Sequence, residues 1–182
     1  MRVSPWVWVL GAVAVASAIG GGLTMLKWHT PPFVSDALHK RTKKPRGIVI
    51  HWSVTSTADH TLNVLQKRGL ATNYEVDHAG TIREYADPKV WYADASGAGA
   101  NSETIAIDLT HLPGQSWQPA QLAATRQLVH HLAQTFGLPV VVAPDGVRND
   151  WHWWRNKGFT VFRHRNLRPT QCPGDFPLEA MV

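Results

Sequence analysis

The sequence predicts a mixed α/β domain, in which helices pack on a single mixed β-sheet, preceded by an N-terminal transmembrane or signal-anchor helix. Within residues 47–182, short apolar runs typical of buried strands alternate with stretches of helical periodicity. Residues 3–26 contain no ionisable side chain, which predicts the preceding helix. The hydrophobic content of 44% is ordinary for a globular chain.

The composition excludes several classes of protein. With 44% hydrophobic and 17% charged residues, the chain is neither disordered nor a collagen or coiled coil. Cys172 is the single cysteine, so no intramolecular disulfide can form. The net charge of +5 and an isoelectric point near 9.7 favour an anionic partner: nucleic acid, a membrane surface or an acidic polymer.

The N-terminal segment, residues 1–28, has two interpretations. At helical rise, residues 3–26 span about 36 Å, enough to cross a hydrocarbon core of roughly 30 Å. Tryptophans lie near both ends of this stretch, where interfacial aromatics are expected. A cleaved signal peptide is the alternative, with a small-residue site at 16–18. Either interpretation sends the rest of the chain out of the cytoplasm.

Residues 29–46 are expected to be a basic, proline-containing tether between that segment and the domain at 47–182. Pro31 and Pro32 stiffen the start of the tether. Its Lys and Arg residues are concentrated between positions 40 and 46. Such a cluster close to a membrane segment favours the cytoplasmic side, so it conflicts with export.

The first half of the domain is expected to contain a buried strand and a hairpin. Residues 47–52 form a short apolar run, which predicts a strand with His51 at its end. Residues 73–77 and 81–85 alternate in polarity, and Gly80 lies between them. This arrangement is typical of two strands joined by a tight turn.

Two helices are expected on this sheet. Residues 61–68 form the shorter one, and residues 119–136 form the clearer one. Pro119 suits the first turn of the longer helix, and Gly137 suits the position just past its end. Two more apolar runs predict buried strands at 104–109 and 139–143.

Three side chains far apart in the sequence form a plausible zinc-ligand set. They are His51, His164 and Cys172, and two histidines with one thiolate leave a fourth position open for water or substrate. The alternative is that a strand-end histidine is structural and that a single cysteine is a small buried hydrophobe. Spacing alone leaves both interpretations open.

Four segments resemble, in order, the blocks of the zinc N-acetylmuramoyl-L-alanine amidases, a family that includes amidase-type phage lysozymes and the peptidoglycan recognition proteins. They are 48–53 (IVIHWS), 73–80 (NYEVDHAG), 104–108 (TIAID) and 164–174 (HRNLRPTQCPG). The last block is the most specific, with a histidine, a cysteine eight residues later, and Pro-Gly. The resemblance implies the fold of that family and implies that Zn²⁺ is held by His51, His164 and Cys172.

The sequence departs from the family pattern at three places. Thr72 stands where many relatives carry a tyrosine, and Thr170 stands where some carry a catalytic lysine. Residues 91–94 (WYAD) replace the family's Trp-His-Ala-Gly. Asp108 occupies the place where another branch carries its catalytic glutamate.

The resemblance implies hydrolysis of the amide that joins the muramyl lactyl group to the L-Ala of the stem peptide. We expect Asp108 to take the proton of the attacking water, and Thr170 to donate a hydrogen bond to the oxyanion. The alternative for Asp108 is an outward-facing polar residue on a strand, and the alternative for Thr170 is an ordinary turn residue. The alternative for the whole protein is a recognition module that binds peptidoglycan without cleaving it.

A tryptophan-rich segment at 147–157 has no counterpart in the family blocks. Its aromatic and basic side chains could stack on sugars and hold stem-peptide carboxylates, although packing over the core is an equal alternative. The substrate-binding candidates are Trp91, Trp151, Trp153, Trp154 and Arg155.

The expected partners are peptidoglycan and, through residues 3–26, the inner membrane. No nucleic-acid motif is present, and we expect a monomer. The Gly/Ala-rich segment resembles the signal-anchor-release segments of some phage endolysins, which predicts a role in host lysis. We therefore expect a single-pass anchor in the inner membrane with the catalytic domain in the periplasm. Whether the anchor later leaves the membrane to give a soluble enzyme is left open by the sequence.

Overall fold

The computed structural model describes residues 27–29 and 35–182. The expected anchor or signal segment at 3–26 lies outside these residues. Within the described part of the chain, no helix has both the length and the apolar content needed to cross a membrane.

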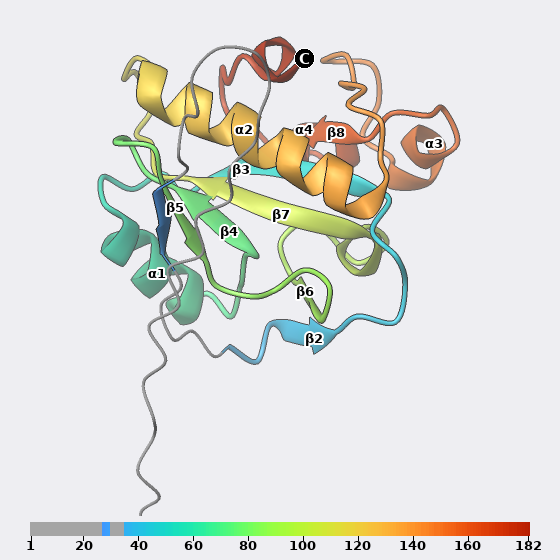
Figure 1. Ribbon diagram of the computed structural model, residues 1–182, viewed down its shortest axis with the longest axis horizontal. Helices are drawn as coiled ribbons and strands as arrows, with labels where there is room; N and C mark the ends of the chain where they lie inside the picture. The colour runs from blue at the N-terminus through green and yellow to red at the C-terminus, as the bar shows by residue number, and fades with distance from the viewer. Residues whose placement is uncertain (1–26, 30–34) are drawn as a thin grey trace, which may run out of the picture.

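A six-stranded sheet forms the centre of the domain (Figure 1). Its order is β1-β5-β4-β7-β3-β8, and only the β4–β5 pair is antiparallel. The sheet is therefore mixed, and the predicted α/β class is confirmed. The strands are β1 (Lys27–His29), β3 (Gly47–Trp52), β4 (Tyr74–Val76), β5 (Thr81–Glu84), β7 (Thr104–Leu109) and β8 (Val161–Arg163).

Two faces of the sheet are distinguished by the alternation of side chains along β3 and β7. Ile48, Ile50, Ile105 and Ile107 belong to one hydrophobic core together with residues of helix α2 (Pro119–Phe136). Because successive side chains in a strand point to opposite faces, His51 and its neighbours at the same level lie on the other face. The sheet thus separates an apolar core from a polar site.

The helices cover both faces of the sheet. Helix α2 packs along one face, and α1 (Ala58–Lys67) lies on the other (Figure 1). Helix α1 begins after Thr57, whose side chain accepts a hydrogen bond from the His60 amide, and α2 ends at Gly137 in the left-handed conformation. The shorter helices are α3 (Trp151–Arg155), α4 (His164–Leu167), η1 (Asn101–Glu103) and η2 (Leu178–Met181).

Residues 35–46, expected to belong to the tether, are folded onto the domain. Strand β2 (Leu38–Lys40) pairs with β6 (Trp91–Ala93) in a two-stranded antiparallel sheet. The Arg41 guanidinium donates hydrogen bonds to the carbonyl oxygens of Ser102 and Thr104. The structure thus extends the folded part of the chain at least to residue 35.

The prediction of a strand at 139–143 is wrong. This segment forms only an isolated bridge between Val142 and Val161, at the edge of the sheet beside β8. The physical reason is that Pro139 begins the segment and Pro144 follows it directly, and proline has no N–H to donate to a strand ladder.

The turn between β4 and β5 requires glycine at position 80, as the sequence indicated. Gly80 has φ = 77°, and a Cβ atom there would lie 2.7 Å from the Ala120 carbonyl oxygen at the start of α2. The hairpin and α2 are therefore in direct backbone contact.

Replacing Gly80 with alanine is expected to lower the free energy of unfolding by about 2–5 kcal/mol, from left-handed strain plus overpacking. Gly69→Ala is the matched control, because Gly69 has φ = 59° but nothing within 4 Å of its would-be Cβ. The control should lose only about 1–2 kcal/mol. Urea unfolding measures both variants, and equal losses would contradict the contact with α2.

Candidate metal centre

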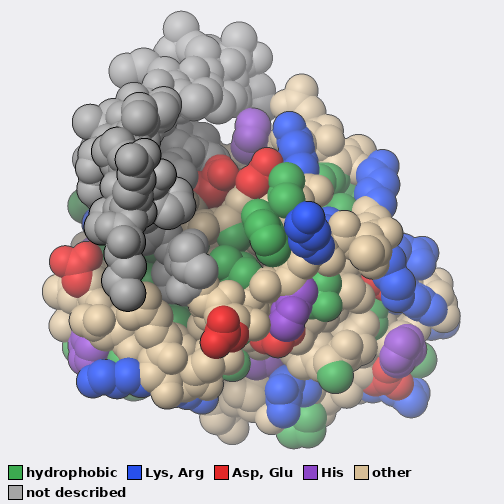
Figure 2. Space-filling view, turned by 90° about the horizontal axis from the view of Figure 1, so that it is seen from below, with side chains coloured by type: hydrophobic (Ala, Val, Ile, Leu, Met, Phe, Trp, Pro, Cys, Tyr) green, Lys and Arg blue, Asp and Glu red, His purple; other side chains and the backbone are tan. Residues whose placement is uncertain are grey.

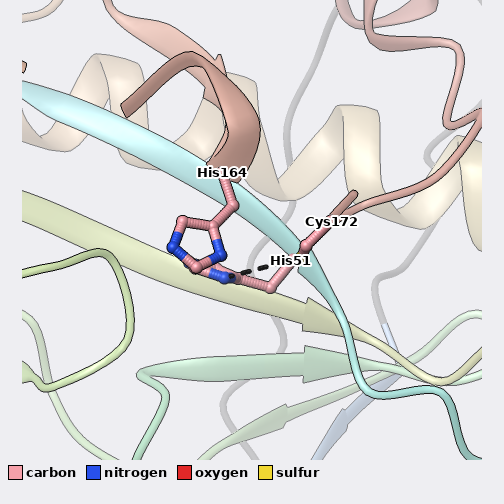
Figure 3. A group of neighbouring side chains, drawn as sticks. All are labelled: His51, His164 and Cys172. Atoms are coloured by element: carbon pink, nitrogen blue, oxygen red, sulfur yellow. Dashed lines mark hydrogen bonds between the residues drawn. The ribbon is translucent and has the colours of Figure 1, made fainter. Parts of the chain in front are cut away.

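The side chains of His51, His164 and Cys172 converge at one end of the sheet (Figure 3). His51 is near the end of β3, His164 is the first residue of α4 directly after β8, and Cys172 lies in the loop that follows. Their ligand atoms all lie within 4.8 Å of one another. The structure thus brings the three expected zinc ligands together.

Hydrogen bonds orient two members of this cluster. Nε2 of His51 contacts the Ser96 hydroxyl at 3.2 Å, while its Nδ1 lies 3.9 Å from Sγ of Cys172. The backbone N–H of Trp52 donates to the same sulfur. The Ser96 contact leaves Nδ1 of His51 free to face the cluster, and outer contacts of this kind are typical around metal ligands.

The protonation states of the histidines suit metal binding. Burial lowers the pKa of His51 well below its ordinary value, and His164 lowers it further. Burial and then Arg168 lower the pKa of His164 to about 4. Both rings are therefore neutral near pH 7, which is the form that binds metals.

The remaining atoms of the cluster also fit a cation. Nε2 of His164 is buried without a hydrogen-bond partner among the described residues. Burial raises the pKa of the Cys172 thiol to about 12, and a nearby positive charge would reverse that shift and favour the thiolate. Two neutral imidazoles and one thiolate form a donor set suited to zinc.

Asp108 lies beside this cluster, on β7. Its Cα pairs with that of His51 across the β3–β7 ladder, so both side chains lie on the face opposite α2. Asp108 is 5% exposed, and its Oδ1 has no hydrogen-bond partner among the described residues. Burial, followed by the charge of Glu75, raises the pKa of Asp108 well above its ordinary value.

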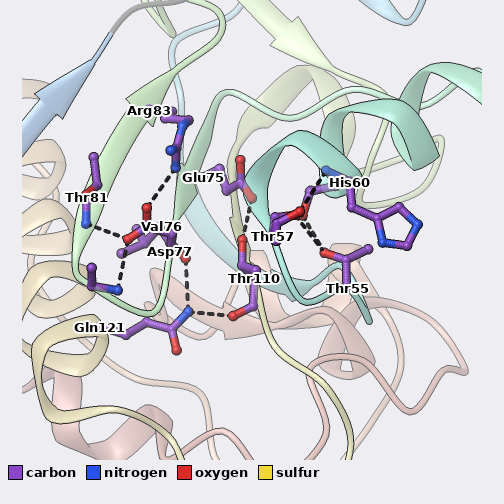
Figure 4. Close-up of polar contacts among 12 residues, drawn as sticks. Thr55, Thr57, His60, Glu75, Val76, Asp77, Thr81, Arg83, Thr110 and Gln121 are labelled. Carbon is purple, nitrogen blue, oxygen red and sulfur yellow. Dashed lines mark hydrogen bonds and ion pairs between the residues drawn. The ribbon is translucent and has the colours of Figure 1, made fainter.

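Glu75 is a second buried carboxylate on the same face. Its Cα pairs with that of Asp108 across the β4–β7 ladder. The hydroxyls of Tyr85 and Thr110 donate to its two oxygens, and Figure 4 shows the contact with Thr110. Burial raises the pKa of Glu75, although these hydrogen bonds oppose the shift. Both oxygens of Glu75 are thus held by partners, whereas Oδ1 of Asp108 has none among the described residues.

The two threonines that depart from the family pattern have different surroundings. Thr170 is partly exposed, and its hydroxyl oxygen accepts a hydrogen bond from the Cys172 amide, which leaves its O–H free to donate. Thr72 is buried, and its hydroxyl donates to the carbonyl oxygens of Tyr74 and Ala106. Thr72 therefore supports the sheet.

The tryptophan-rich segment is largely structural. Trp151 and Trp154 are buried at 3% and 0% exposure in a second core with Phe162, so their rings are not available to a ligand. Trp153 is partly exposed, with Arg148 and Lys157 near its ring.

The structure also shows the surroundings of the other two substrate-binding candidates, Arg155 and Trp91. Arg155 forms an ion pair with Glu103 at 3.4 Å. Trp91 lies in β6, partly exposed, and its carbonyl oxygen accepts a hydrogen bond from Asn73. Of the tryptophans in the segment, only Trp153 keeps an accessible ring.

Two contacts at the centre could not be placed from the sequence. Ser96 lies in a Gly/Ala-rich loop, where nothing in the local sequence indicates contact with His51. Glu75 alternates with buried apolar residues, but its position beside Asp108 depends on the strand order, which the sequence does not reveal.

Asp108→Asn is expected to stabilise the metal-free protein above about pH 4. Because the folded-state pKa of Asp108 is raised, its stabilising protonated form is lost as the pH rises from its unfolded value of about 3.9 through the folded value. The amide does not ionise, so its melting temperature should exceed the parent's by at least about 2 °C at pH 7. The difference in melting temperature should vanish below about pH 4. Calorimetry in the presence of a chelator measures both proteins across this pH range. A difference that does not change with pH would contradict the prediction.

Comparisons with known proteins agree with this geometry. A model of the N-acetylmuramoyl-L-alanine amidase family matches residues 41–175. No curated protein sequence matches the chain.

Solved structures with a similar fold include the endolysin N-acetylmuramoyl-L-alanine amidase LysCS from Clostridium intestinale. It has a TM-score of 0.64 and 18% identity, and the match covers 85% of this chain and 92% of that one. The Ph2119 endolysin from the Thermus scotoductus bacteriophage Ph2119 matches with a TM-score of 0.60 and 14% identity, covering 85% and 96%. The family match spans most of the 182 residues, so the protein belongs to the N-acetylmuramoyl-L-alanine amidase family and is an enzyme of peptidoglycan hydrolysis.

Proposed function

We propose that the protein cleaves the amide between the lactyl group of N-acetylmuramic acid and the L-Ala of the stem peptide with the help of zinc. The convergence of His51, His164 and Cys172 in a chain of this family is the observation that carries the proposal. These three residues would hold the metal, because their donor atoms suit zinc and one of them, Nε2 of His164, is otherwise unpartnered among the described residues. Zinc with three protein ligands activates a water molecule and polarises a carbonyl group.

Asp108 would move the proton of the reaction. The attacking water forms a bond to the amide carbon, the carbon–nitrogen bond breaks, and the proton of the water must reach the leaving amine. Oδ1 of Asp108 is the atom available for this transfer, since it lies on the face of the cluster and has no other partner among the described residues. Glu75 is less available for this transfer, because each of its oxygens already accepts a hydrogen bond.

Thr170 would stabilise the negative charge that develops on the carbonyl oxygen. Its hydroxyl oxygen is held by the Cys172 amide, so the direction of the O–H is restricted while the proton stays free to donate. A binding module without hydrolysis would need neither an open metal position nor an unpartnered buried carboxylate, and so the arrangement favours the enzyme.

Two variants test this proposal, one by removing a metal ligand and the other by removing the proton acceptor. Cys172→Ser removes a thiolate ligand, so zinc content and activity should both fall to near zero. Asp108→Asn preserves the ligands, so zinc should remain stoichiometric while the hydrolysis rate falls by about 10²–10⁴. Metal analysis and the release of stem peptides from purified peptidoglycan measure the two quantities.

Asp108→Glu is the control for the second variant, and it should keep part of the activity because it restores an acid with a different reach. Parent-level hydrolysis by Asp108→Asn would place the proton acceptor elsewhere. Full zinc occupancy in Cys172→Ser would refute the ligand assignment.

We also propose that the protein is a phage endolysin that acts from the periplasmic side of the inner membrane as a monomer. Support comes from the endolysins among the similar folds and from the uncharged segment at 3–26. Strand β1 follows that segment directly and pairs with β5. An anchor at 3–26 would therefore hold the domain near the bilayer surface.

Alkaline phosphatase fused after Val182 tests this location, since the enzyme folds only where its disulfides form. The full-length fusion is expected to be active, and a matched fusion that lacks residues 1–28 should be inactive. Equal inactivity of both fusions would mean that the basic residues at 40–46 hold the domain in the cytoplasm.

A further inference from the structure

A cavity of about 560 Å³ opens on the α1 side of the sheet, next to the metal centre. Ala95 and Gly97 line it, and Ser96 between them contacts His51. Arg168 lines it as well and lies close enough to His164 to lower the pKa of that ring. The volume is in the range of sites that bind small ligands, so a short stretch of substrate beside the scissile bond would fit. Figure 2 views the molecule from this side.

A chain of hydrogen bonds holds the wall of this cavity in place. Asn101 accepts from the Ser96 amide and donates to Oδ1 of Asp94. Oδ2 of Asp94 contacts the His39 ring at 2.8 Å. Both oxygens of Asp94 are therefore engaged within the wall. The wall also depends on β2, which supplies His39.

Arg168 supplies a positive charge to the cavity. It is exposed, and its guanidinium makes no ion pair or hydrogen bond with any residue in 35–182 that the structure describes. Two arginines in the same segment differ, because Arg163 pairs with Glu179 and Arg165 pairs with Asp145. The Arg168 side chain extends over Gly97, where a Cβ atom would lie 3.7 Å from its Nη1. Its charge is thus free for a ligand.

The substrate carries a matching anion. The stem residue after L-Ala is a glutamate joined onward through its γ-carboxyl, so its α-carboxyl is either a free carboxylate or an amide. This is the first free carboxylate beyond the scissile amide. A guanidinium binds a carboxylate through two parallel hydrogen bonds and gains no such charge-assisted pair with an amide.

We propose that Arg168 makes this cavity a subsite selective for stem peptides whose second residue keeps its free carboxylate. The proposal rests on the amidase activity proposed above. It makes Arg168 a specificity-determining residue, distinct from the residues that hold the metal or move the proton.

The test compares two peptidoglycan preparations that differ only in whether the second stem residue is the free acid or the amide. The parent enzyme should cleave the acid form with a kcat/KM about 10- to 100-fold higher, from one charge-assisted pair. Arg168→Gln should lower kcat/KM much more on the acid form than on the amide form, so that the preference between the two preparations is lost. Arg168→Lys should retain part of the preference, because it keeps the charge without the planar fork.

Arg126→Gln is the matched control, because it removes one exposed arginine from α2, on the other side of the sheet, and should keep the full preference. Zinc content and melting temperature should match the parent in every variant. An equal loss on both preparations in Arg168→Gln, or a parent enzyme without preference, would overturn the proposal while the amidase activity stands. A parent enzyme that cleaves neither preparation would overturn the amidase activity itself.

Discussion

The parallel pairing of β3 with β7 is the constraint on which the rest of the structure depends. Its register places His51 opposite Asp108, so the proposed metal ligand and the proposed proton acceptor occupy the same level of the same face. Moving the register by one residue would turn one of the two side chains into the apolar core beneath α2. The core on that face is built from Ile48, Ile50, Ile105 and Ile107, so burial of these residues also fixes the site. Stability and catalytic geometry are thus set by the same strands.

The site places two carboxylates where folding disfavours their charged forms. Asp108 and Glu75 are both buried on adjacent strands, and the charge of Glu75 raises the pKa of Asp108. Glu75 is satisfied by two hydroxyl groups, while Oδ1 of Asp108 has no partner among the described residues. An unpartnered buried carboxylate costs stability, and it is retained where its chemistry is needed. A bound cation beside Asp108 would offset part of that cost.

Local sequence signals predicted the elements that local physics determines. The strands at 47–52 and 104–109 and the helix at 119–136 have the predicted bounds, because each combines an apolar pattern with clear end signals. Helix α1 begins at Ala58, earlier than expected, because Thr57 is its cap. The contacts of Ser96 and Glu75 could not be predicted, since they depend on strand order and on a loop with no local pattern. The convergence of the proposed zinc ligands was expected from family resemblance, whereas their spacing alone left a structural alternative open.

The basic run at 40–46 has two explanations. As a sequence pattern it is a membrane-topology signal, and in the structure it makes contacts within the fold. Arg41 donates to backbone carbonyls of the domain, and Lys43 and Arg46 approach Glu103, which also pairs with Arg155 of α3. Glu103 is almost completely buried, and although burial acts to raise its pKa, the hydrogen bonds and charges of Lys43 and Arg155 outweigh it and lower the pKa. Positive charge is therefore required here to keep a buried carboxylate ionised, whichever side of a membrane the domain occupies. Three of the five cations in this run, Arg41, Lys43 and Arg46, are accounted for by contacts within the fold, so the run is weak evidence about topology.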